Sequence, residues 1–190
     1  MSEYAAFLRG MNVGGHRISN GELGRCFEEL GFRDVGTFRA SGNVIFAADA
    51  ATADLDPSDT PLVEMTARIE AGLEASLGYA VPVFLRTASE VRQIAAHQPF
   101  LTPTIEASKG KPQVVMLSAK PAAQARKAVL ALASEEDDLA FGDRELHWLP
   151  SGGILDSALD FKLIGQLLGP MTTRTKGTIE QVAAKYFADG

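Results

Sequence analysis

The order of apolar segments in the first half of the chain is the feature that most constrains its fold. Strands and helices are predicted in the order βαββαβ, with strands at 3–9, 33–39, 43–47 and 81–86 and helices at 20–30 and 61–77. This is the order of the ferredoxin-like split βαβ arrangement, in which two helices pack on one face of an antiparallel sheet. The sequence therefore predicts an α+β fold whose first unit spans residues 1–86.

The second half follows the same plan less completely. A helix is predicted at 87–97, and the proline-rich segment 98–112 is expected to lack regular structure. The elements predicted after it are a strand at 113–118, a helix at 121–133, a hairpin with strands at 139–141 and 145–149, and a helix from Ser157 to Leu168. We expect a second ferredoxin-like (alpha-beta plait) unit over residues 87–190, which ends in an extra helix at 179–188.

A glycine-rich turn joins the first strand to the first helix in the segment YAAFLRGMNVGG, residues 4–15. The helix opens with Ser19 and Glu22 at the spacing of a capping box. A strand, a glycine turn and a helix start favour a bound anion, because free amide N–H groups and the helix dipole both attract negative charge. The glycines do not have the spacing of a dinucleotide-binding motif or a P-loop. An anion site and a simple tight turn both remain open.

The segment TTRTKGT, residues 172–178, precedes the predicted final helix. Thr178 and Gln181 have the spacing of a capping box there. Arg174 and Lys176 would oppose the dipole of that helix, so a compensating negative group is expected. It is either a bound anion or an Asp or Glu from another element.

The glycine-rich turn, the hairpin turn at Ser41-Gly42-Asn43 and the Thr173-Arg174 segment are predicted to form one composite ligand site. Arginine can contact a phosphate through two hydrogen bonds, asparagine can read a base or sugar edge, and glycine N–H groups can complete the cradle. Phe38 and Phe46 are expected in the core rather than as stacking platforms. The predicted ligand-binding residues are Arg9, Gly10, Asn12, Gly14, Gly15, Ser41, Asn43, Thr173 and Arg174.

Composition excludes several classes of protein. The net charge is −6, which argues against a protein that coats nucleic acid. No apolar run approaches the roughly 20 residues that cross a bilayer, and no export signal is recognisable. The single cysteine, Cys26, fits a reducing cytoplasm, where we expect the protein. The three histidines are far apart in the sequence, so no metal site is predicted. Catalytic residues, cofactor and oligomeric state remain open.

The segments YAAFLRGMNVGG, VGTFRASGNVIF and MTTRTKGT resemble those of the bacterial family catalogued as domain of unknown function 1697. The resemblance implies two ferredoxin-like units and no established activity. Its recurrent positions fall on the predicted ligand-binding residues and on Gly42. The family's usual Asn-Trp-Asn-Thr-like run after the late arginine is replaced here by Thr175 to Thr178, which removes an aromatic that could stack on a base.

The sequence thus predicts a bacterial protein that binds a phosphate-bearing small molecule or a nucleotide. Two alternatives use the same observations. One is a small enzyme, a phosphoryl or nucleotidyl transferase or a hydrolase, acting at the same site. The other is a protein interaction module without a small ligand. Whether the chain is an enzyme stays open at this point.

Overall fold

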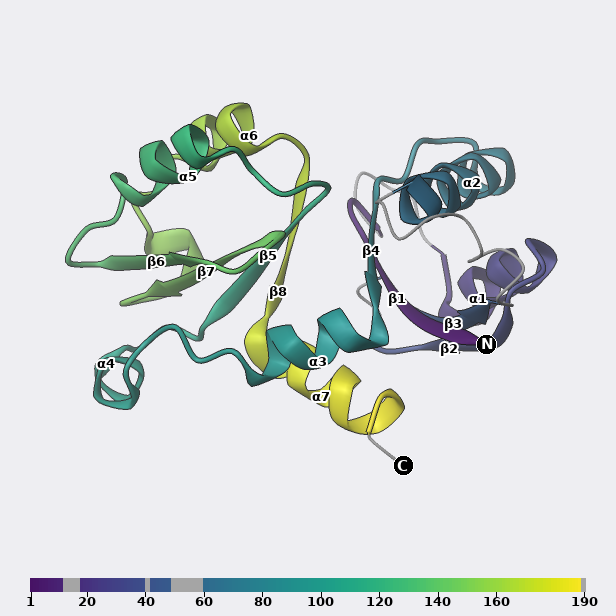
Figure 1. Cartoon of the computed structure of the whole chain (residues 1–190), viewed down its shortest axis with the longest axis horizontal. Coiled ribbons are helices and arrows are strands. Elements are labelled where there is room, and N and C mark those ends of the chain that lie inside the picture. The colour runs from purple at the N-terminus through teal and green to yellow at the C-terminus, as the bar shows by residue number, and fades with distance from the viewer. Residues whose placement is uncertain (12–17, 40–41, 49–59, 189–190) are drawn as a thin grey trace. The chain divides into compact units, whose positions relative to one another are not determined.

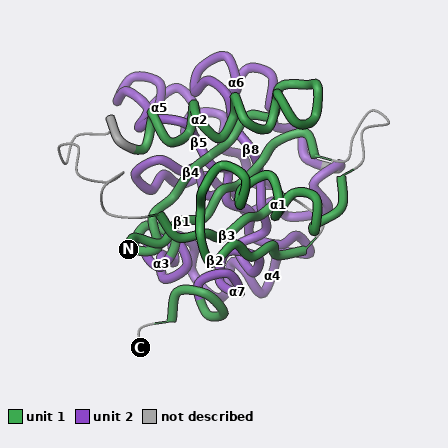
Figure 2. The backbone as a smooth tube through the Cα atoms, turned by 90° about the vertical axis from the view of Figure 1, so that its right-hand side faces the viewer, with its two compact units in different colours: residues 1–91, 184–190 green, residues 92–183 purple. Residues whose placement is uncertain are grey.

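The chain is organised in two compact units, each with its own antiparallel sheet (Figures 1 and 2). The computed structural model describes residues 1–11, 18–39, 42–48 and 60–188. The first unit comprises residues 1–91 and 184–190, and the second comprises residues 92–183. The chain therefore passes between the units twice, once within each of two helices.

The first unit has the predicted ferredoxin-like topology. Its strands lie in the order β2-β3-β1-β4, and all neighbouring strands are antiparallel. Its elements are β1 (Ser2–Leu8), α1 (Asn20–Glu29), β2 (Arg33–Thr37), β3 (Asn43–Ala48), α2 (Thr60–Leu77) and β4 (Val83–Thr87). The predicted capping box of α1 is present, with Ser19 and Glu22 each accepting from the other's backbone N–H.

Helices α1 and α2 cover one face of this sheet (Figure 1). Alternation along β1 places one row of its side chains in the core on that face. Phe46 lies within this core, with its ring centroid 4.4 Å from that of Phe32, 5.4 Å from Phe27 and 5.6 Å from Tyr4. The helices contribute residues spaced three or four apart, as an amphipathic helix requires. These are Leu23 and Phe27 from α1, and Met65, Ile69 and Leu73 from α2. The prediction that Phe46 lies in the core is confirmed.

The matching prediction for Phe38 is wrong. Strand β2 ends at Thr37, and Phe38 follows it with a half-buried ring. The strand stops because the backbone reverses at once, with Arg39 in the left-handed region at φ 58°. The ring of Phe38 meets that of Tyr186, near the end of the chain, and is not part of the cluster around Phe46.

The second unit repeats the topology, with strands in the order β6-β7-β5-β8 and all neighbours antiparallel. Val115, Leu117 and Leu146 form its core with one residue from each covering helix, Val129 and Ile164. Its elements are α4 (Thr102–Ala107), β5 (Gln113–Leu117), α5 (Ala123–Leu130), β6 (Asp137–Phe141), β7 (Glu145–Pro150), the 3₁₀ helix η2 (Ile154–Asp156), α6 (Phe161–Leu168) and β8 (Met171–Thr175). Helix α3 (Ala88–Ala96) leads into this unit, and α7 (Lys176–Tyr186) leads out of it.

Three predictions for the second half are corrected. The proline-rich segment contains α4, because Pro103 lies in the first turn, where its missing N–H costs nothing. Helix α6 begins after Asp160, which accepts from the N–H of Leu163, and not at Ser157. Residues 171–175 form β8, for which no strand was predicted, and α7 begins at Lys176 rather than at Ile179.

In both units the last strand of the sheet is joined to the following helix by the same hydrogen bond. The last strand of each sheet finishes in Arg-Thr, and the threonine accepts from a backbone N–H in the first turn of the next helix. Thr87 accepts from Glu90, and Thr175 accepts from Thr178, each at 3.2 Å. Arg86 pairs with Ala5 of β1, and Arg174 holds the same place in β8, opposite Val114 of β5. This repetition supports the inference that both units follow one plan.

Candidate functional site

The candidate site lies at one end of the first sheet, which we call the loop end. It comprises the carboxyl ends of β1 and β2 and the amino ends of β3 and β4. Two backbone hydrogen bonds join the predicted turns to their neighbours there. The N–H of Leu8 donates to the carbonyl of Gly42 at 2.8 Å, and the N–H of Arg9 donates to the carbonyl of Pro82 at 2.9 Å. The glycine turn after β1 and the hairpin turn before β3 therefore lie side by side.

Glycine is required at the closest approach of the two turns. Gly42 has a φ of 67°, and a Cβ added there would lie 2.7 Å from Cγ of Met11 and 3.1 Å from Cβ of Leu8. Gly10 also has a positive φ, of 75°. Both glycines thus permit backbone conformations that a side chain resists, and Gly42 also leaves room for Met11.

Arg9 directs a positive charge to solvent at the loop end. The residue is exposed, and its guanidinium forms no hydrogen bond or ion pair with the described part of the chain. Gly10 beside it is exposed as well. An arginine in this position can approach an anion with several N–H groups in a fixed plane.

Asn43 has a structural role in the hairpin. It is buried, and its Nδ2 donates to the carbonyl of Phe38 at 2.9 Å, while the N–H of Phe38 donates to the carbonyl of Asn43. The side chain thus holds the turn that places Gly42 beside β1. Four predicted site residues lie outside the described residues: Asn12, Gly14, Gly15 and Ser41.

Phe38 forms a small aromatic and cationic cluster at the same end of the sheet. The guanidinium of Arg39 lies 5.4 Å from its ring centroid and the amine of Lys185 lies 5.9 Å away. Tyr186 meets it edge to face, with centroids 6.3 Å apart. The sequence did not identify this cluster, because Phe38 and the last turn of α7 are brought together only by the fold. An adjacent aromatic and arginine in Phe38-Arg39 was the available signal.

Thr173 and Arg174 lie in β8 of the second unit. The Arg174 side chain turns back on its own strand, where Nη1 donates to Oγ1 of Thr172 at 3.0 Å and to the carbonyl of Thr173 at 2.9 Å. Burial lowers the pKa of Arg174 to about 10, which still leaves it charged at neutral pH. The part assigned to these two residues in a composite ligand site stays a prediction.

A compensating negative group was expected near Lys176, either a bound anion or a carboxylate from another element. Lys176 does pair with a carboxylate, but this carboxylate belongs to its own helix. Its Nζ lies 3.0 Å from Oε1 of Glu180, one turn further along α7, and donates to the carbonyl of Ala95 at 2.6 Å. This pair compensates a cation in the first turn of the helix.

Two histidines that are distant in the sequence meet in the second unit. His147 in β7 is 1% exposed, its Nε2 has no hydrogen-bond partner, and its ring centroid lies 4.8 Å from that of His97. Burial, followed by the charges of His97 and Lys176, lowers the pKa of His147 to about 4. His147 is therefore a neutral, packed residue at neutral pH.

This lowered pKa predicts an acid-dependent loss of stability. Between pH 6.5 and about 4, His147 is protonated in the unfolded chain but stays neutral in the folded protein. The free energy of unfolding therefore falls as the pH falls through this range. The full loss from this group is about 3 kcal/mol. In urea titrations at pH 7, 5.5 and 4.5, His147→Gln should lose less stability on acidification than the wild type. Parallel pH profiles for the two proteins would contradict the assignment.

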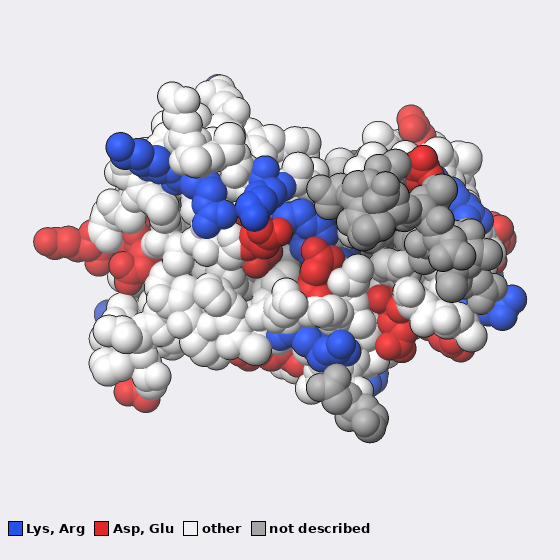
Figure 3. Space-filling view, in the orientation of Figure 1, with Lys and Arg blue, Asp and Glu red and all other residues white. Residues whose placement is uncertain are grey.

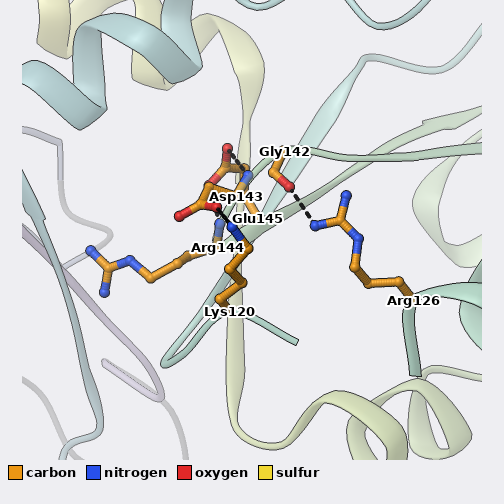
Figure 4. A network of polar contacts seen from close by, with 6 residues as sticks. All are labelled: Lys120, Arg126, Gly142, Asp143, Arg144 and Glu145. Carbon is orange, nitrogen blue, oxygen red and sulfur yellow. Dashed lines mark hydrogen bonds and ion pairs between the residues drawn. The ribbon is translucent and has the colours of Figure 1, made fainter. Parts of the chain in front are cut away.

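A polar network lies at the β6–β7 turn (Figure 4). Lys120 pairs with Asp143 at 2.6 Å, and this hydrogen bond is the main reason that the pKa of Asp143 is lowered. Arg126 donates to the carbonyl of Gly142 at 3.0 Å. The buried Glu145 accepts the N–H groups of Asp143 and Arg144. Figure 3 shows Lys and Arg side chains gathered over α5 and the end of β5.

Among the described residues, no group of three or more His, Cys, Asp and Glu side chains is arranged to hold a metal ion. His16 lies outside that part of the chain. A search of the described helices finds none long and apolar enough to cross a membrane.

Comparison with known proteins adds family and fold. Residues 1–147 match the model of a family described as "Protein of unknown function (DUF1697)". A solved structure, that of conserved bacterial protein SP0830 from Streptococcus pneumoniae, superposes with a TM-score of 0.67 at 19% identity, covering 96% of this chain and 97% of that one. At this identity the likeness concerns the fold alone. No curated protein matches the chain.

Proposed function

This chain belongs to the DUF1697 family of proteins of unknown function, and we propose that it binds a phosphate-bearing small molecule of the nucleotide class at the loop end of the first sheet. The observation that carries the proposal is the placement of Arg9. Its exposed guanidinium follows a strand whose last N–H is bonded to the neighbouring hairpin turn, so the backbone that presents it is fixed. A fixed backbone reduces the entropy lost when a ligand binds.

Negative charge is the chemistry favoured at this end of the sheet. Arg9 and Arg39 are both exposed there, on neighbouring turns. The described ends of the four strands, residues 8–10, 37–39, 42–43 and 82–83, contain these two cations and no carboxylate. The carboxylate of Glu70 also reaches this end of the sheet, where it accepts from the N–H of Val83 at 2.9 Å. A phosphate would find its charge-assisted donors in the two guanidinium groups.

Phe38 adds a surface on which a base could stack. Its strand is separated from β1 by β3 alone, so Phe38 and Arg9 lie two strand spacings apart, about 10 Å. A nucleotide can span that separation, with its phosphate at Arg9 and its base at Phe38. Stacking of a base on an aromatic ring contributes about 1–3 kcal/mol.

The proposal is tested by a thermal-shift screen with ATP, adenosine, tripolyphosphate and inorganic phosphate. The phosphorylated compounds should raise the melting temperature of the wild type, and Arg9→Ala should abolish the shift while the apo melting temperature stays nearly unchanged. The affinity should fall by at least about tenfold, as expected for the loss of a charged hydrogen-bond donor.

Arg25→Ala is the matched control, since Arg25 is an exposed arginine in α1. It should keep the ligand-induced shift. If Arg9→Ala unfolds the apo protein, Arg9 has a structural role and the proposal fails. Turnover of a nucleotide during the same incubation would identify an enzyme acting at this site. A wild type that responds to none of the compounds would favour the interaction module.

A further inference from the structure

A concave site in the second unit is separate from the loop end of the first sheet. It has a cavity volume of about 400 Å³, within the range of small-molecule pockets. It lies where β6 begins and β7 ends, beside the chain that follows α4. Residues that line it include Ala107, Lys109, Glu136, Asp137, Ser151 and Ser157.

Asp137 is the unusual residue of this cavity. It is 1% exposed, and its Oδ1 accepts from Nε1 of Trp148 at 2.6 Å and from Oγ of Ser157 at 2.9 Å. Its Oδ2 is buried without a hydrogen-bond partner. No lysine or arginine among the described residues forms an ion pair with this carboxylate. A buried carboxylate that is half satisfied is costly, so a positive donor beside it would be strongly stabilised.

The other charged side chains around this cavity are mostly acidic, as Asp137 is. A second concavity of about 160 Å³ shares Ala107, Glu136 and Ser151 with the first and adds Glu135 and Asp138. Acidic side chains also gather at the left of Figure 3, over the connection into β6. Lys109 is the one cation among the residues that line the two concavities, and it is exposed.

We propose that this cavity binds a small ligand that carries a primary ammonium group, such as an aliphatic diamine or polyamine. The ammonium would donate to Oδ2 of Asp137 and to the carboxylate of Glu136. The χ2 torsion of an aspartate is broad, so a small rotation turns Oδ2 toward the cavity while Oδ1 stays near Trp148. The hydroxyl of Ser151 offers a further acceptor.

The test uses isothermal titration calorimetry of the full chain with putrescine and spermidine, and with putrescine acetylated at both ends as the neutral control. The two amines should bind and the acetylated compound should not. Asp137→Asn keeps an oxygen for Trp148 and Ser157 but removes the charge, and it should weaken amine binding by at least about tenfold. Lys109→Gln should bind the amines at least as tightly as the wild type.

Two further variants separate loss of the site from loss of the fold. Glu136→Gln changes an exposed side chain of the cavity and should weaken binding while the melting temperature is unchanged. Glu64→Gln makes the same change on an exposed face of α2, in the other unit, and should bind like the wild type. The proposal is overturned if neither amine binds the wild type. It is also overturned if a folded Asp137→Asn binds the amines with wild-type affinity, or if Lys109→Gln lowers the affinity for the amines.

Discussion

Phe46→Ala should lower the free energy of unfolding of the first unit by about 3–5 kcal/mol, the usual cost of removing a buried phenylalanine. Phe46 is 1% exposed, and its ring contacts those of Tyr4, Phe27 and Phe32. The substitution leaves a cavity among rigid aromatic rings that cannot collapse easily. Urea titration followed by far-UV circular dichroism measures the change.

Phe38→Ala is the matched control for this substitution. The ring is half-buried and has one aromatic neighbour, Tyr186, so its removal should cost only about 1 kcal/mol. Trp148 is the only tryptophan and belongs to the second unit, so its fluorescence reports unfolding there separately. Similar losses for Phe38→Ala and Phe46→Ala would contradict the assignment of one ring to the surface and the other to the core.

Gly110→Ala should destabilise the second unit by about 3 kcal/mol. A Cβ at this position would lie 2.2 Å from the carbonyl oxygen of Pro150 and 2.4 Å from that of Gly152. Both are backbone atoms, which cannot move aside as a flexible side chain does. The same loop is held by the hydrogen bond from the N–H of Lys109 to the carbonyl of Ser151, at 2.9 Å. Urea titration followed by Trp148 fluorescence reads the effect.

The same substitution at Gly165, to alanine, should instead stabilise the second unit. Gly165 lies inside α6, and its added Cβ would meet Cε of Met171 at 3.5 Å, an ordinary contact. Alanine in a helix is more stable than glycine by about 0.5–1 kcal/mol. Equal losses at Gly110 and Gly165 would show that the close approach at Gly110 does not determine its effect.

Most of the fold could be predicted from the sequence because helices and strands each leave their own repeat of apolar residues, which is read within one segment of the chain. The stripe of α1 and the apolar runs of β1 and β5 identified helices and buried strands without knowledge of their partners. Strand β8 was missed because its sequence, MTTRT, has no apolar alternation. It is a strand through its pairing with β5, from Gln113 opposite Thr175 to Leu117 opposite Met171. That pairing cannot be seen in a segment of one methionine followed by four polar residues.

The candidate site was predictable only in part, for a related reason. Glycine and arginine after an apolar strand identified the turn at Arg9 and Gly10, since those residue types have specific backbone and charge properties. The neighbouring Gly42 turn came from the hairpin pattern. The cluster of Phe38 with Lys185 and Tyr186 joins the β2–β3 turn to the last turn of α7, and only the fold brings them together. The carboxylate of Asp137 likewise depends on Trp148 and Ser157.

The most direct test of ligand binding at the loop end is a titration of the ¹⁵N-labelled protein with ATP, followed by amide chemical shifts. Saturable shifts should appear at Arg9, Gly10, Arg39 and Gly42, and tripolyphosphate should reproduce those at Arg9 and Gly10. Arg9→Ala should lose them and Arg25→Ala should keep them. Absence of saturable shifts at the loop end, or shifts that are the same in Arg9→Ala and the wild type, would contradict the proposed function.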